Sequence, residues 1–311
     1  DSMTQESEIP LLLDEPVSPS SANTAKDIFA GTMGGIAQVL VGQPFDTTKV
    51  RLQSSSNPNT SPIEVVRSLL KNEGPLAFYK GSLLPLIGIG ACVSIQFSVN
   101  EYMKRVFTYI NNGPGNMTIG QFFIAGGLGG FANGFLAGPI EHVRIRLQIQ
   151  TKTTSTNNNS RIYKGPFDVL KHLNEVGGIS TIYRGIVPTL LRESLGIGIY
   201  FMTFEALVQN SMKKNNLLRK QVESWKLCLY GGLSGYTMWL TCYPIDVIKS
   251  KLQTDTLGNW KYKNSLSVVK DLWKTQGWRG FFVGFTPTIL RAAPANAATF
   301  VAFEWTMRLL N

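Results

Sequence analysis

The chain has few charged residues and lacks the common motifs of catalytic chemistry. Asp, Glu, Lys and Arg make up only 16% of its 311 residues, against about 25% in an ordinary soluble domain. The phosphate loop G-x-x-x-x-G-K-S/T, the zinc motif H-E-x-x-H and the hydrolase motif G-x-S-x-G are all missing. The sequence therefore predicts a protein that is not an enzyme.

Cysteine is also scarce, with three residues at Cys92, Cys228 and Cys242. An odd number without C-x-x-C spacing excludes a disulfide framework and a zinc site of the usual kind. We expect no metal and no cofactor.

Acidic residues are concentrated in one short segment. The first 25 residues hold five acids and no base, so the rest of the chain carries 30 bases against 15 acids. A basic body suits nucleic acid, anionic lipid or small anions, and the low charged fraction argues against nucleic acid. Residues 1 to 25 predict a disordered acidic tail, unlike an Arg-rich transit peptide.

Long stretches without charge are the main structural signal. Residues 28 to 45, 81 to 100, 106 to 140 and 227 to 245 contain no Asp, Glu, Lys or Arg, and a membrane-spanning helix needs about 20 mostly apolar residues. Two similar stretches, 186 to 207 and 286 to 307, are interrupted by Arg192-Glu193 and by Arg291, and each carries one acid near its end, Glu205 or Glu304. We expect an all-α membrane protein with six kinked transmembrane helices. The alternative is a soluble domain with buried helices, because the mean hydropathy is only +0.02.

One motif occurs three times in register. The pattern Pro-x-Asp/Glu-x-x-Lys/Arg-x-Lys/Arg-Leu-Gln begins at Pro44, Pro139 and Pro244. Each copy is followed by an acid or amide near a glycine, an aromatic residue near a second glycine, and an apolar stretch bearing one acid. Segments 63 to 70 and 167 to 173 have the helical spacing of a short surface helix. We predict three repeats of helix, surface helix and helix, at 26 to 112, 113 to 217 and 218 to 311.

These motifs resemble the mitochondrial carrier family of inner-membrane solute transporters, over about residues 26 to 311. Arg192-Glu193 and the segment 291 to 297 are most similar to its carnitine, ornithine and amino-acid branch. The resemblance implies a multi-pass protein of the mitochondrial inner membrane that carries a small molecule by alternating access. We expect a monomer in contact with membrane lipid, including cardiolipin at the matrix surface. Bases in the loops after the Pro motifs suit the matrix side, which turns both termini toward the intermembrane space.

The repeated charges imply a gate on the matrix side. In the family, each motif acid pairs with the base of a neighbouring repeat, and a glutamine four residues after the base braces the pair. The acids here are Asp46, Glu141 and Asp246, the bases are Lys49, Arg144 and Lys249, and the glutamines are Gln53, Gln148 and Gln253. Charges at membrane depth persist chiefly when they are paired. A permanent structural ring with no moving part is the alternative.

A second ring is expected on the cytosolic side. Its acids are Glu101, Glu205 and Glu304. The base expected three residues later is present only as Lys104, since Val208 and Met307 replace it in the other copies. A weaker cytosolic ring predicts a resting state that is open to the cytosol.

Substrate ligands should lie where the repeats disagree, because a small substrate is not threefold symmetric. The positions 13 and 12 residues before each acid of the second ring are Gly88-Ile89, Arg192-Glu193 and Arg291-Ala292. Two guanidiniums can clamp a carboxylate, and Glu193 can receive an ammonium group. The set suits a small zwitterion, such as a neutral or acidic amino acid or a carnitine ester.

Three alternatives stay open for these residues. Arg192 and Glu193 can form a pair that only links helices. Glu193 can act as the proton relay of a regulated ion leak through the same cavity. The substrate can also be an anion of the nucleotide type, although the triple-arginine run typical of such carriers is missing after the last Pro motif.

Overall fold

A computed structural model of the chain describes residues 21–55, 60–111, 117–150, 162–215 and 222–310. Residues 1 to 20 of the predicted acidic tail lie outside the described residues. The tail prediction was too long, because residues 21 to 25 already form the first turn of a helix. Ala22 and Ala25 favour this extension, since alanine has the highest helix propensity.

The described chain is helical and holds no strand, which confirms the all-α prediction. Its six long helices are α1 (Ser21–Ser54), α3 (Leu83–Ile110), α4 (Ile119–Ile149), α6 (Ile186–Asn215), α7 (Ser224–Thr254) and α9 (Phe285–Leu310). Its short helices are α2 (Pro62–Asn72), α5 (Pro166–Ile182) and α8 (Ser265–Gln276), with 3-10 turns η1 (Pro75–Tyr79) and η4 (Gly277–Phe282). The order long, short, long therefore occurs three times.

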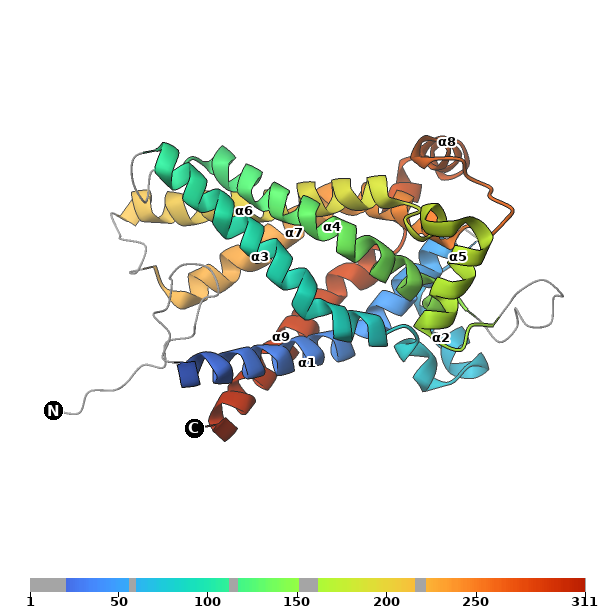
Figure 1. The fold of residues 1–311 in the computed structure, drawn as a ribbon, viewed down its shortest axis with the longest axis horizontal. Helices are drawn as coiled ribbons and strands as arrows, with labels where there is room; N and C mark the ends of the chain where they lie inside the picture. Colours follow the sequence, from blue (N-terminus) through green and yellow to red (C-terminus); the bar gives the residue numbers. More distant parts are fainter. Residues whose placement is uncertain (1–20, 56–59, 112–116, 151–161, 216–221, 311) are drawn as a thin grey trace.

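The long helices run side by side along the longest axis of the molecule (Figure 1). The short helices α2, α5 and α8 gather at one end, and the start of α1 and the end of α9 lie at the other. The most extensive contacts join α4 to α6, α1 to α9, α6 to α7 and α3 to α4. The first and last long helices therefore pack directly against each other.

A hydropathy window alone finds fewer spans than the uncharged stretches predict. Among the described residues, α4 is long and apolar enough to cross a membrane, and Pro75–Gly88 with Gly90–Ile110, bent by 47°, is a second candidate if it counts as one span. The other long helices carry charges that lower their average hydropathy, namely the motif charges in α1 and α7, Arg192, Glu193 and Glu205 in α6, and Arg291 and Glu304 in α9.

Each motif proline lies inside the first long helix of its repeat. Pro44, Pro139 and Pro244 stand within α1, α4 and α7. A proline in a helix interior removes one backbone hydrogen bond and bends the helix. The bends come just before the motif charges, which lie on the last turns of these helices.

In each repeat, an aromatic residue stands near a second glycine after the short helix, and we call this segment the aromatic box. Its glycines allow the short segments to approach the next repeat closely. Gly81, Gly185 and Gly284 have φ of 80°, 80° and 82°, a region that favours glycine. A Cβ atom on Gly81 would stand 2.9 Å from the carbonyl oxygen of Arg144, and one on Gly284 would stand 3.3 Å from that of Lys49. The remaining glycine of the box, Gly185, approaches the motif glutamine Gln253 instead of a base, so each repeat is held against the motif of a neighbour.

Glycines also bring α4 and α6 together. Side chains on Gly126, Gly130 and Gly134 would collide with α6, at Gly130 with the carbonyl of Glu193 itself. The corresponding Gly31 and Gly235 have open space instead. Close packing through small residues therefore holds the two long helices of the middle repeat.

A mostly buried ion cluster fastens the first repeat to the second. Glu73, which follows α2, receives Nη1 of Arg51 at 2.5 Å and Nζ of Lys80 at 2.5 Å. Arg51 Nε also donates to the carbonyl of Gln148 at 3.0 Å, and Lys80 Nζ donates to that of Gln150 at 3.1 Å. Burial alone would raise the pKa of Glu73, but the two bases offset it and leave that pKa below its usual value.

We predict that Gly81→Ala lowers the unfolding temperature of the purified protein. The new Cβ requires a left-handed backbone that costs a non-glycine residue about 1–2 kcal/mol, and it also meets the Arg144 carbonyl. Gly232→Ala is the control, since nothing lies within 4 Å of its Cβ and the residue is inside α7. Equal unfolding temperatures for both variants in detergent would contradict the close approach.

We predict that Glu73→Gln destabilises the protein in a pH-dependent way. A carboxylate with a lowered folded pKa stabilises fully above its ordinary pKa of about 4.3, and this contribution is lost as pH falls through the folded pKa. The gap in unfolding temperature between wild type and variant should be widest near neutral pH and close in acid. Glu64→Gln is the control, because Gln also serves in the capping box of α2. A gap that does not change with pH would refute the ionic account.

Candidate functional site

A charged cavity of about 190 Å³ lies among five of the long helices. Its lining includes five bases, Lys49, Arg144, Arg192, Lys249 and Arg291. Only three acids line it, Asp46, Glu141 and Asp246. The excess of positive charge favours an anionic group in this space.

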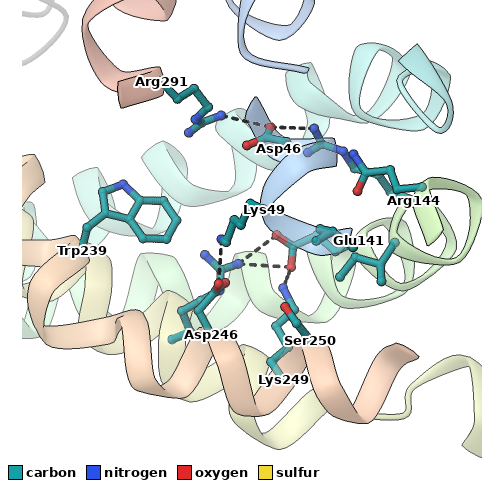
Figure 2. A pocket seen from close by; sticks show the side chains of 13 residues that line it. Asp46, Lys49, Glu141, Arg144, Trp239, Asp246, Lys249, Ser250 and Arg291 are labelled. Carbon is teal, nitrogen blue, oxygen red and sulfur yellow. Dashed lines mark hydrogen bonds and ion pairs between the residues drawn. The ribbon is translucent and has the colours of Figure 1, made fainter. Parts of the chain in front are cut away.

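Three ion pairs at this cavity join the repeats into a closed ring (Figure 2). They are Asp46 with Arg144 (2.7 Å), Asp246 with Lys49 (2.6 Å), and Glu141 with Lys249. Each pair connects two different repeats. The structure thus brings together the six residues of the predicted matrix gate in the predicted combinations, whereas their role as a gate remains a proposal.

The predicted substrate arginines contact the acids of the same ring. Arg192 Nη2 donates to Glu141 at 2.9 Å and 3.1 Å, and its Nε lies 3.6 Å from Asp246. Arg291 Nη1 donates to Asp46 at 3.2 Å. The sequence did not predict these contacts. Arg192 lies on α6 and Arg291 on α9, and no spacing along the chain relates either residue to a motif acid.

Glu193 lies beside Arg192 and forms an ion pair with it. Its carboxylate also receives Nδ2 of Asn133 from α4 at 3.4 Å. The Glu193 side chain is mostly buried, so it presents a shielded negative charge next to the guanidinium.

The first repeat offers no side chain at the equivalent position. Gly88 lies against α4, where an added Cβ would meet Ile140 at 2.8 Å. The side chain of Ile89 lies outside the part that the structure describes. The charged side chains at these positions therefore belong to the second and third repeats, and their role as substrate ligands is a proposal.

Only one of the three predicted glutamine braces contacts its ion pair. Gln53 Nε2 donates to Asp246 at 3.3 Å. Gln148 instead donates to Thr47 Oγ1, and Gln253 to the backbone carbonyl of Arg184, both at 3.4 Å. These two glutamines therefore join helix ends to neighbouring segments, and the brace prediction does not hold for them.

Residues next to the motif proline support two of the bases instead. Gln43 Oε1 accepts from Arg144 Nη2 at 2.6 Å, and the same nitrogen donates to Asp46 at 2.7 Å. Lys49 Nζ lies 5.4 Å from the ring centre of Tyr243 and 4.9 Å from that of Trp239. The sequence offered a signal for these two residues, because Gln43 and Tyr243 directly precede motif prolines and so lie close to the motif charges along the helix.

The predicted cytosolic acids have contacts within their own helices. Lys104 pairs with Glu101 at 3.1 Å, one turn away on α3, and Glu205 accepts from Gln209 on α6 at 3.1 Å. The side chain of Glu304 lies outside the described residues. In this structure Lys104 therefore pairs with an acid of its own helix, and the cytosolic ring stays a prediction.

Comparison with known proteins agrees with this arrangement. The family model described as mitochondrial carrier protein matches residues 20–111, 115–215 and 220–311. The chain is 53% identical over 315 residues to the mitochondrial glycine transporter of Saccharomyces cerevisiae, covering 99% of this chain and 100% of the relative. It is 50% identical over 297 residues to the glutamate/glycine mitochondrial carrier of Schizosaccharomyces pombe, covering 93% and 97%. It is 38% identical over 282 residues to the human mitochondrial basic amino acids transporter, covering 89% and 88%.

Proposed function

Because the chain belongs to the mitochondrial carrier family, we propose that it moves a small amino acid across the mitochondrial inner membrane by alternating access. Membership of this family makes the chain a transporter of small molecules rather than an enzyme. The names of two relatives include glycine, and one of them includes glutamate. The observation that carries the proposal is the pair of guanidiniums, Arg192 and Arg291, in a small cavity with more bases than acids.

The two charged ends of an amino acid match the groups available. Arg291 and Arg192 can each donate to a carboxylate, as they do to Asp46 and Glu141 in this structure. Glu193 can accept an ammonium group. Gly88 leaves the first repeat without a carboxylate, so a long basic side chain would have no partner there.

Substrate binding would compete with the ring for the same arginines. A guanidinium nitrogen that donates to Asp46 or Glu141 must give up part of that contact to bind a substrate carboxylate. A ligand drives a conformational change only through its different affinity for the two states. Competition of this kind weakens the closed ring only when substrate is present.

Two features support an empty state that is open to the cytosol. The ring at the cavity is fully paired across the repeats, whereas Lys104 pairs within its own helix. The ring residues would accordingly form the matrix gate, and Glu101, Lys104, Glu205 and Glu304 would form the weaker cytosolic gate.

The short helices would lie at the matrix surface of the membrane. In α8 and η4, Leu266, Trp273 and Trp278 are about two-thirds exposed, and the guanidinium of Arg279 lies 5.7 Å from the Trp278 ring centre. Exposed tryptophans beside bases suit the headgroup region of an anionic bilayer, including cardiolipin. Both termini would then face the intermembrane space.

The repeat boundaries at 26–112, 113–217 and 218–311 would divide this carrier into three equivalent units. We propose a monomer as the working form, because the three repeats of one chain complete the ring of ion pairs. The relatives are named as amino-acid carriers, and neither the ion-leak nor the nucleotide alternative is favoured.

We predict that Arg291→Ala lowers glycine uptake by roughly 10- to 100-fold, the effect of losing a hydrogen bond to a charged group. Arg291→Lys should recover little, because the ammonium lacks the forked geometry. The measurement is uptake of radiolabelled glycine, alanine, glutamate, carnitine and ADP by purified protein in liposomes. Exposed Arg105→Ala on α3 is the control. Near-normal uptake of every probe by folded Arg291→Ala would contradict the assignment of Arg291 as a substrate-binding residue.

A separate prediction concerns Glu193 and the amino group of the substrate. Glu193→Gln should weaken uptake of an amino acid far more than uptake of a carboxylate of equal size without the amine. Paired assays with glycine and acetate in the same liposomes measure this difference. Equal losses would support a purely structural Arg192–Glu193 pair, and loss of proton flux alone would support the ion leak.

A further inference from the structure

The largest apolar group that faces the cavity is the indole of Trp239 on α7. Figure 2 shows this ring opposite the ion-pair ring, with Lys49 between them. Lys49 Nζ lies 4.9 Å from the ring centre, and Tyr243 packs against the indole at 6.3 Å between centres. Contacts on two sides hold the indole in place.

Trp239 breaks the threefold pattern of the chain. It stands five residues before the motif proline, where the other repeats have Val39 and Gly134. The cavity therefore has one bulky wall, on the side of the third repeat. An asymmetric wall can distinguish substrates whose charged ends are identical.

We propose that Trp239 sets the upper length of the substrate side chain, an inference that rests on the proposed amino-acid transport. Arg192 and Arg291 fix where a carboxylate can bind, so the substituent on the α-carbon must occupy the remaining space. That space belongs to a cavity of about 190 Å³ whose apolar lining is Val50, Ile145 and Trp239. The indole occupies one side of this space, so each added methylene brings the substrate side chain closer to a wall that contacts with Lys49 and Tyr243 hold in place.

A different account makes Trp239 only a support for the ring. In that account the indole stabilises the Lys49 ammonium through the cation–π contact, worth about 0.5–2 kcal/mol. Loss of the contact would then alter uptake of every amino acid by the same factor. Dependence on the length of the substrate separates the two accounts.

The test compares wild type, Trp239→Phe and Trp239→Ala in liposomes, with radiolabelled glycine, alanine, 2-aminobutyrate and norvaline. Wild-type kcat/KM should fall steeply along this series. In Trp239→Ala the ratio of norvaline to glycine should rise about tenfold or more, the discrimination that a methylene pocket supports. Trp239→Phe should be intermediate, since it keeps a ring but shortens the wall.

Trp305→Ala is the matched control, because this tryptophan of α9 is 69% exposed and does not line the cavity. Its ratio should equal that of wild type. An unchanged ratio in both Trp239 variants, or an equal loss for all four amino acids, would overturn the size limit while leaving amino-acid transport intact. If Trp239→Ala does not fold, the Phe variant alone decides. Wild-type protein that carries none of the four would refute the proposed function, and the size limit with it.

Discussion

The ring of three ion pairs is the constraint on which the rest of the structure depends. Each pair takes its acid from one repeat and its base from another, so no repeat can satisfy its charges alone. Removing one partner of a buried pair costs about 3–5 kcal/mol, because the other charge is left uncompensated. The proline bends, the box glycines and the contact between α1 and α9 all serve to bring these charges to one place.

The ring is threefold in pattern but unequal in support. The position before the motif proline is occupied by Gln43, Gly138 and Tyr243. Gln43 bonds to Arg144, and Tyr243 stacks near Lys49, whereas a glycine offers nothing to Lys249. Every ring acid contacts a second base, but Glu141 is the most exposed of the three acids, at 29%. The seam between the second and third repeats is thus the least supported part of the ring.

The sequence was sufficient for the parts that repeat and insufficient for contacts made across them. Three copies of one motif predicted the order of long and short helices, and the acid and base of each copy predicted the pairing. Gln148 and Gln253 occupy the same motif position as Gln53, yet they bond elsewhere. Gln53 also donates to the hydroxyl of Tyr243, the side chain before the neighbouring proline, and that position differs between copies. The contacts of Arg192 and Arg291 depend on helix packing, which no local pattern encodes.

The departures from symmetry give the cavity its chemistry. Gly88 provides no charge where the other repeats provide Arg192 and Arg291, and a side chain there would have to displace the end of the Ile140 side chain. The guanidiniums hold ring acids while the cavity is empty, so the groups that would recognise a carboxylate are the same groups that reinforce the closed ring. A ligand that withdraws them from Asp46 or Glu141 binds better as the ring loosens. Substrate recognition and opening of the ring would then depend on the same hydrogen bonds of Arg192 and Arg291. No other part of the structure would be needed to couple the two events.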